Sequence, residues 1–101
     1  MIVYISGKIT GSNNYEIQFE KAELWLRLKG YKVVNPVKVC KSLVGVFEDK
    51  DFYEIDINLL FKCDCIFMLN GWQNSKGAKT ELQVAPIIFW LSSSKAPSGS
   101  P

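Results

Sequence analysis

The feature that most constrains the fold is a β-α-β pattern at the start of the chain. Ile2–Ile5 is a short run of β-branched and aromatic residues, and Tyr31–Val34 is a second such run. Between them, Tyr15–Lys29 carries apolar residues at helical spacing, and Gly30 stands where a glycine commonly ends a helix. Two strands joined through one helix within about 35 residues pair in parallel with a right-handed crossover. The pattern therefore predicts an α/β fold.

The remainder of the chain continues this alternation. Helical patterns cover Asp51–Lys62 and Gly77–Ala85, and apolar strand-like runs cover Cys65–Leu69 and Ile87–Leu91. Val37–Lys50 is less regular and is predicted to be a loop with one helical turn at most. The sequence thus predicts a parallel sheet of about four strands with helices on both faces.

Length and composition indicate one domain. The 101 residues are 48% hydrophobic and 13% aromatic, which is ordinary for a globular chain with a modest core. We assign residues 1–91 to the domain and expect residues 92–101, rich in Ser, Pro and Gly, to form a disordered tail. Met1 leads directly into a strand pattern, and no apolar run reaches the ~20 residues that span a bilayer. We expect a cytoplasmic protein without a membrane partner.

Charge and residue types exclude several classes of function. The net charge is +2 and no basic run exists, so a nucleic-acid polymer is not an expected partner. The chain has no histidine, which removes Ser-His and Cys-His catalysis and most zinc chemistry. Cys40, Cys63 and Cys65 lack zinc-ligand spacing and are predicted to be reduced, buried thiols. We expect no metal and no cofactor, so carboxylates, Tyr, Lys or thiols would carry any chemistry.

The stretch from Ser75 to Glu81 is the strongest candidate for a site. It follows a predicted strand and turn, at the edge of the sheet where open α/β folds bind ligands. Backbone N–H groups at the start of a helix favour anions, so Ser75 and Gly77 stand where a phosphate could be held. Glu81 lies about one turn further on, and the alternative is that it is a solvated helix residue. Trp72, in the preceding loop, could stack on a base.

Two further candidates stay open on the residues alone. The loop from Gly7 to Gly11 lacks the third glycine of a dinucleotide fingerprint and the Gly-Lys-Ser/Thr of a P-loop, so it is either a phosphate contact or a plain strand-to-helix turn. Asp56 lies within a predicted helix, where its carboxylate points at the carboxyl edge of the sheet or faces water. Asp64, just before a strand, is predicted to be a turn residue.

Taken together, these motifs resemble the nucleoside 2-deoxyribosyltransferase superfamily, in particular its small, often phage- or prophage-borne branch described as a domain of unknown function, DUF4406. The resemblance covers roughly residues 1–85. It depends on the order and spacing of Ile2-Val-Tyr-Ile-Ser-Gly-Lys-Ile-Thr-Gly11, Val34-Asn-Pro36, Asp56, Asp64 and Ser75-x-Gly-x-x-x-Glu81-Leu. It implies a three-layer, flavodoxin- or Rossmann-like fold and an enzyme that acts on the N-glycosidic bond of deoxynucleosides.

The resemblance implies a role for each candidate residue. Glu81 matches the nucleophile, Asp56 an aspartate that assists departure of the base, and Tyr4 a tyrosine that orients the nucleophile. Ser75 stands where the transferases carry an aspartate and where the related 2′-deoxynucleoside 5′-phosphate N-hydrolases carry a phosphate-contacting serine, which favours a deoxynucleotide over a free deoxynucleoside. The implied substrate-binding residues are Ser6, Gly7, Lys8, Gly11, Trp72, Ser75 and Gly77.

The end of the chain departs from the family pattern, because Pro86 follows the last predicted helix at once. The short helix leaves apolar surface for a partner to cover, so we expect a homo-oligomer. Three functions are compatible with the sequence: an N-glycosidase or deoxyribosyltransferase, a catalytically weak module that binds or senses a nucleotide, and an interaction protein that keeps only the fold.

Overall fold

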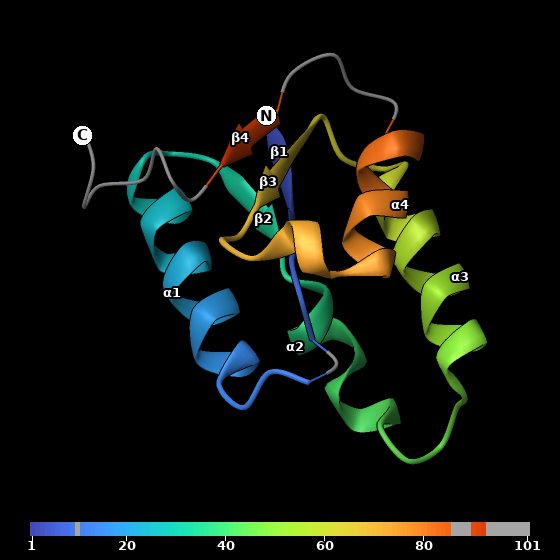
Figure 1. Cartoon of the computed structure of the whole chain (residues 1–101). Helices are drawn as coiled ribbons and strands as arrows, with labels where there is room; N and C mark the ends of the chain where they lie inside the picture. The colour runs from blue at the N-terminus through green and yellow to red at the C-terminus, as the bar shows by residue number, and fades with distance from the viewer. Residues whose placement is uncertain (10, 86–89, 93–101) are drawn as a thin grey trace.

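The computed structural model describes residues 1–9, 11–85 and 90–92 (Figure 1). Strands and helices alternate along the chain. The elements are β1 (Ile2–Ser6), α1 (Tyr15–Leu28), β2 (Lys32–Val34), α2 (Pro36–Cys40), the 3-10 turn η1 (Lys41–Leu43), α3 (Asp49–Leu60), β3 (Cys65–Met68), the 3-10 turn η2 (Trp72–Asn74), α4 (Lys76–Val84) and β4 (Trp90–Ser92). Within the described residues, no helix combines the length and the apolar character that crossing a membrane requires.

The strands form one parallel sheet in the order β2-β1-β3-β4 (Figure 1). β1 pairs with β2 on one side and with β3 on the other, so that Tyr4 lies opposite both Val34 and Ile66. The chain reaches β2 through α1, and then crosses to the other side of β1 through α3 to enter β3. This reversal between β1 and β3 is the flavodoxin-like arrangement. It confirms the predicted fold class.

Helices cover both faces of the sheet (Figure 1). Successive side chains of a strand point to opposite faces. Val3 and Ile5 of β1 therefore pack with Phe19 of α1 in one core cluster. Tyr4, between them, belongs to a second cluster with Leu60 of α3 and Ala78 of α4. The molecule thus has the three layers that the resemblance implied.

Gly30 ends α1 as predicted. Its φ is 95°, a left-handed conformation that favours glycine. The N–H of Gly30 donates to the carbonyl of Arg27 at 2.9 Å, and the N–H of Tyr31 donates to that of Leu26 at 3.1 Å. This pair of bonds is the Schellman motif, which satisfies two terminal carbonyls of the helix and turns the chain into β2.

The segment after β2 contains more helix than the single turn that the sequence predicted. Asn35 caps α2, because its side-chain oxygen accepts hydrogen bonds from the N–H groups of Val37 (3.1 Å) and Lys38 (3.3 Å). Pro36 occupies the first helical position, which suits its fixed φ and missing N–H. The Asn-Pro pair therefore starts a helix as well as ending a strand.

Most other boundaries shift by one or two residues, and two of the differences have a structural consequence. α3 begins at Asp49, two residues earlier, where the side chain of Asp51 accepts a hydrogen bond of 3.0 Å from the N–H of Glu48. The fourth strand is described at Trp90–Ser92, while residues 86–89 lie outside the described residues. Ser92 therefore belongs to the sheet, and the predicted tail is left with residues 93–101, which also lie outside them.

Candidate functional site

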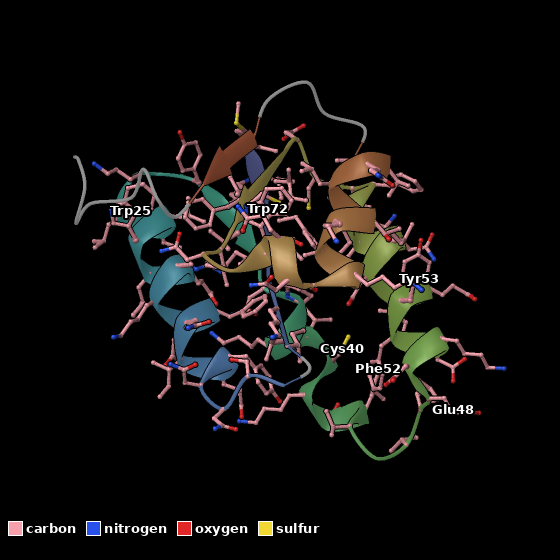
Figure 2. The ribbon with its side chains drawn as sticks, viewed as in Figure 1. Trp25, Cys40, Glu48, Phe52, Tyr53 and Trp72 are labelled. Carbon is pink, nitrogen blue, oxygen red and sulfur yellow. The ribbon has the colours of Figure 1, made fainter. Side chains whose placement is uncertain are left out.

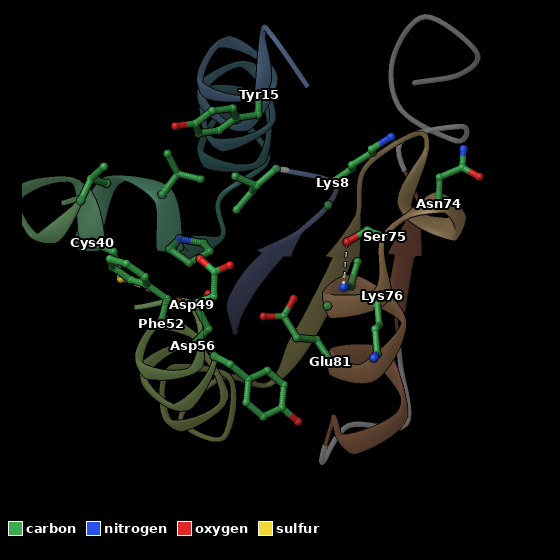
Figure 3. Close-up of a pocket in the computed structure, with 18 residues that line it drawn as sticks. Lys8, Tyr15, Cys40, Asp49, Phe52, Asp56, Asn74, Ser75, Lys76 and Glu81 are labelled. Carbon is green, nitrogen blue, oxygen red and sulfur yellow. Dashed lines mark hydrogen bonds between the residues drawn. The ribbon is translucent and has the colours of Figure 1, made fainter. Parts of the chain in front are cut away.

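A cavity of about 590 Å³ opens at the carboxyl ends of the central strands (Figure 3). Residues 7–9 follow β1, Pro36 and Val37 follow β2, and residues 74–78 follow β3, and all of them line it. Its size falls within the ~300–1,000 Å³ of small-molecule sites. The strand order reverses beside it, which is where open α/β sheets bind ligands.

Glu81 reaches the sheet from α4 and has both carboxylate oxygens bonded. Its Oε2 accepts a hydrogen bond of 2.7 Å from Tyr4 Oη, and its Oε1 accepts one of 2.6 Å from Ser6 Oγ. Tyr4 and Ser6 are two positions apart on β1 and therefore point to the same face. Glu81 is only 8% exposed, so the alternative of a solvated helix residue is wrong. The two hydroxyl donors set the orientation of the carboxylate before any ligand binds.

Burial and hydrogen bonding shift the pKa of the Glu81 carboxyl in opposite directions. Burial raises the pKa of Glu81 above its ordinary value, although the hydrogen bonds from Ser6 and Tyr4 favour its charged form. Burial, together with the charge of Glu81, also raises the pKa of Tyr4 well above its ordinary value. The phenol of Tyr4 therefore stays protonated and remains a donor.

Asp56 of α3 lines the same cavity (Figure 3). The first of the two alternatives for this residue therefore holds, because its side chain belongs to the carboxyl edge of the sheet. Burial, followed by the negative charge of Glu81, raises the pKa of Asp56 to about 7, although a hydrogen bond from the Cys40 thiol lowers it. A carboxyl with that pKa is both a competent acid and a competent base near neutral pH.

Ser75 caps α4 at the mouth of the cavity. Its Oγ accepts a hydrogen bond of 3.1 Å from the N–H of Ala78. A hydroxyl that accepts one bond keeps its own O–H for another partner. Lys76 and Gly77, at the start of the helix, also line the cavity, and Lys8 lines it from the loop after β1. This side of the cavity combines hydroxyl, ammonium and helix N-terminal groups, all of which favour an anion.

The structure brings most of the predicted residues together. The cavity-lining residues among them are Gly7, Lys8, Asp56, Ser75, Gly77 and Glu81. Tyr4 and Ser6 are buried and reach the cavity through Glu81. The Ser6 hydroxyl, predicted to contact substrate, is used to hold Glu81.

Two predicted residues lie elsewhere among the described part of the chain. Gly11 occupies a turn with a φ of 82° and is not part of the cavity lining. Trp72 begins η2 and packs against the core cluster that contains Tyr4 and Leu60, again outside the lining (Figure 2). Its prediction as a base-stacking residue therefore has no support from its position.

Three aromatic residues of the cavity lining were missed by the sequence interpretation. They are Tyr15, Phe52 and Tyr53, and Phe52 lies beside Cys40 (Figure 3). Phe52 precedes Asp56 by four residues, which places both on one face of α3. This four-residue spacing was the sequence signal that could have identified Phe52 as a lining residue. No comparable signal pointed to Tyr15, because it lies at the start of a helix in another layer.

The thiols behave as the sequence predicted. Cys40, Cys63 and Cys65 are buried and unpaired. Burial, followed by the charge of Asp64, raises the pKa of Cys63 and of Cys65 to about 11, so neither forms a thiolate near neutral pH. Asp64 itself accepts a hydrogen bond of 2.9 Å from the N–H of Ile2. Among the described residues, no group of His, Cys, Asp and Glu side chains could hold a metal ion.

A family model described as a domain of unknown function (DUF4406) matches residues 1–89, which include every site residue named above. No curated protein and no solved structure matches the chain. The resemblance to nucleoside 2-deoxyribosyltransferases therefore stays an expectation.

Proposed function

The chain belongs to the DUF4406 family, whose description names no activity, and we propose that it cleaves or transfers at the N-glycosidic bond of 2′-deoxynucleosides or their 5′-monophosphates. One observation carries the proposal. A buried carboxylate held by two hydroxyl donors, Glu81, shares a cavity with a second carboxyl group, Asp56, whose pKa is about 7. Glycosidic chemistry needs such a pair, because one group must attack carbon while the other moves a proton.

In the first step Glu81 attacks C1′ of the sugar. A bond forms between a Glu81 oxygen and C1′, and the bond between C1′ and the base nitrogen breaks through an oxocarbenium-like transition state. The electron pair of the broken bond stays on the base, which takes a proton from Asp56. Tyr4 and Ser6 hold the attacking carboxylate still, so little ordering is required at the moment of reaction.

In the second step the covalent sugar is released. Asp56, now a carboxylate, accepts a proton from an incoming water, and the water oxygen bonds to C1′ as the bond to Glu81 breaks. A second base in place of water makes the reaction a transfer. Either route restores both carboxyl groups to their starting states, so no metal, redox partner or further cofactor is required.

The lining of the cavity supports a substrate of this shape. Phe52 lies one turn from Asp56 on α3, so a base stacked on Phe52 would have its leaving nitrogen near that acid. Lys8, Ser75 and Lys76 lie on the other side, where a 5′-phosphate would extend. Within the described part of the chain, neither lysine takes part in an ion pair. These polar groups favour a 5′-monophosphate over a free nucleoside as the substrate. The presence of a serine at position 75 favours the same choice.

The direct test is release of free base. The protein is incubated with each deoxynucleoside and each 5′-monophosphate, and the products are separated by chromatography. Glu81→Gln should abolish release while nucleotide binding stays within a few-fold, because the amide keeps the shape and removes the charge. Asp56→Asn should slow release by ~10²–10⁴-fold. Glu54→Gln makes the same change as Glu81→Gln at an exposed position of α3 and should leave the rate unchanged.

The alternatives predict different results. Binding of nucleotides without release of base would replace the enzyme with the binding or sensing module. If the protein neither bound nucleotides nor released base, the remaining alternative would be an interaction protein that keeps only the fold. Release by Glu81→Gln at the wild-type rate would exclude Glu81 as the nucleophile.

A further inference from the structure

Cys40 lines the cavity but has no role in the proposed reaction. It is the last residue of α2, is 7% exposed, and its Sγ lies 3.8 Å from Oδ1 of Asp56. Within the described residues, this is the one side-chain hydrogen bond that Asp56 makes. Burial, followed by the charge of Asp56, raises the pKa of the Cys40 thiol, so the thiol stays protonated and acts as the donor.

α2 is held in place from its other end. Asn35, which caps α2, donates from Nδ2 to Oε1 of Glu23 at 3.1 Å. Lys38, on α2 itself, places its Nζ 3.3 Å from the same oxygen. Glu23 belongs to α1 and is 5% exposed, so this connection is buried. The backbone that carries Cys40 is thereby tied to α1, and the thiol is presented to Asp56 from an anchored helix.

We propose that Cys40 is a positioning residue, which holds the Asp56 carboxyl oriented in the cavity through a hydrogen bond from its thiol. A donor to a carboxylate also favours the charged form. Cys40 therefore lowers the pH at which Asp56 changes between acid and base. The consequence for reaction rate rests on the proposed function, whereas the contact and its effect on titration do not.

Cys40 acts against the two influences that raise the pKa of Asp56. Burial and then the charge of Glu81, from α4, raise the pKa of Asp56, and the thiol from α2 lowers it. Tyr4, from β1, is coupled to the same carboxyl. The remaining charged groups that line the cavity are Asp49 on α3 itself, Lys8 from the loop after β1, and Lys76 on α4. These charged groups are retained when Cys40 alone is replaced, and a replacement that also fills the space of the thiol keeps the burial of Asp56.

The test is the titration of the Asp56 carboxyl, followed by carbon NMR on aspartate-labelled protein and assigned with Asp56→Asn. Cys40→Ala should raise the pKa of Asp56 by roughly half a unit or more, because the opposing hydrogen bond is lost. Cys40→Val fills the space of the thiol without a donor and should give the same shift. Cys40→Ser keeps an O–H donor and should bring the pKa back towards the wild-type value.

The matched control is Cys63→Ala. Cys63 is equally buried, but its thiol donates to the carbonyl of Leu59, and it does not line the cavity. It should leave the titration of Asp56 unchanged. Folded Cys40→Ala or Cys40→Val with a wild-type pKa at Asp56 would overturn the proposal, as would an equal shift in Cys63→Ala.

The pH dependence of base release provides the second measurement. A general acid loses its proton as the pH rises through its pKa, so the rate falls on the basic side. In Cys40→Ala this basic limb should move to higher pH by the same amount as the NMR titration. If the wild-type protein releases no base, the titration still decides the role of Cys40. If base is released and the titration does not move, the role of Cys40 fails and the proposed function stands.

Discussion

Tyr4 Oη donates a hydrogen bond of 2.7 Å to Oε2 of Glu81, across 77 positions of the chain. Tyr4 lies in the central strand of the sheet and is fully buried, whereas Glu81 lies in the last described helix. Because Ser6 of the same strand bonds the other oxygen, β1 determines where the carboxylate sits. The sheet, rather than a loop, therefore supports the Glu81 carboxylate, which favours a precise geometry.

Tyr4→Phe should therefore affect both stability and rate. It removes one donor from a buried carboxylate, and a buried polar group left unsatisfied costs ~1–3 kcal/mol. The pKa of Glu81 should rise further, because the bond from Tyr4 favours the charged form. Denaturant unfolding gives the loss of stability, and base release should slow. Tyr31→Phe removes a hydroxyl from a partly buried tyrosine outside the cavity, and it should change stability by less than ~0.5 kcal/mol.

Asp56 should make the protein less stable as the pH rises towards neutrality. Its pKa is about 7 in the folded state and ~4 in an unfolded chain. Between these values the folded state holds a proton that the unfolded state has lost, so stability falls as pH rises from ~4 to ~7. Asp56→Asn should raise the melting temperature relative to wild type at pH 8, and the difference should shrink towards pH 4. Parallel pH curves for the two proteins would contradict this assignment.

Ser75→Ala should weaken the binding of 5′-monophosphates more than the binding of free nucleosides. A phosphate-directed hydrogen bond has a partner only in the former, and a charge-assisted bond is worth roughly 1.5–3 kcal/mol. Loss of the helix cap alone would lower stability by ~1 kcal/mol without discriminating between substrates. Ser75→Asp separates the two effects, because it keeps the cap and repels phosphate. If Ser75→Ala lost the same amount of binding for both substrate classes, the free nucleoside would be favoured as the substrate.

Gly7 should resist substitution at the floor of the cavity. A Cβ at this position would lie 2.9 Å from Cβ and Cδ1 of Leu69, a buried residue just after β3. Gly7→Ala must therefore separate the ends of β1 and β3, and such overpacking costs ~1–3 kcal/mol. Gly77→Ala is the control, since its Cβ would meet only Ser75 Oγ at 3.9 Å. Thermal unfolding should show a clear loss for Gly7→Ala and a neutral or slightly stabilising effect for Gly77→Ala.

Glu23→Gln should destabilise the protein at neutral pH but not in acid. Burial opposes the charge of Glu23, but hydrogen bonds from Arg27, Asn35 and Lys38 outweigh it and lower the pKa of the carboxyl. A lowered folded pKa contributes stability that is present above the unfolded value, ~4.3, and is lost as the pH falls through the folded one. The difference between variant and wild type, measured by denaturant unfolding, should therefore vanish at low pH. Glu54→Gln, at an exposed position, should show no such dependence.

The amino-acid sequence by itself determined the elements and the edge of the sheet that carries the site. At the end of α1, the N–H groups of Gly30 and Tyr31 donate to carbonyls three and five positions earlier, respectively. Ser75 caps α4 through a residue three positions later. Such signals work over a few residues, and helical or strand periodicity is likewise local. The alternation of strands and helices then leaves few topologies, so the parallel order and the location of the cavity follow.

Only the tertiary structure decided the surroundings of each candidate site residue. Glu81 is buried because Tyr4 and Ser6, in a strand from the other end of the chain, bond its oxygens. Asp56 acquires its high pKa from burial and from Glu81 on another helix, and Trp72 packs, partly buried, against a core cluster instead of lining the cavity. Burial, charge coupling and packing depend on which distant elements meet. Local sequence patterns carry no record of those distances, which is why the candidate residues were identified from the sequence and their burial and charge coupling were not.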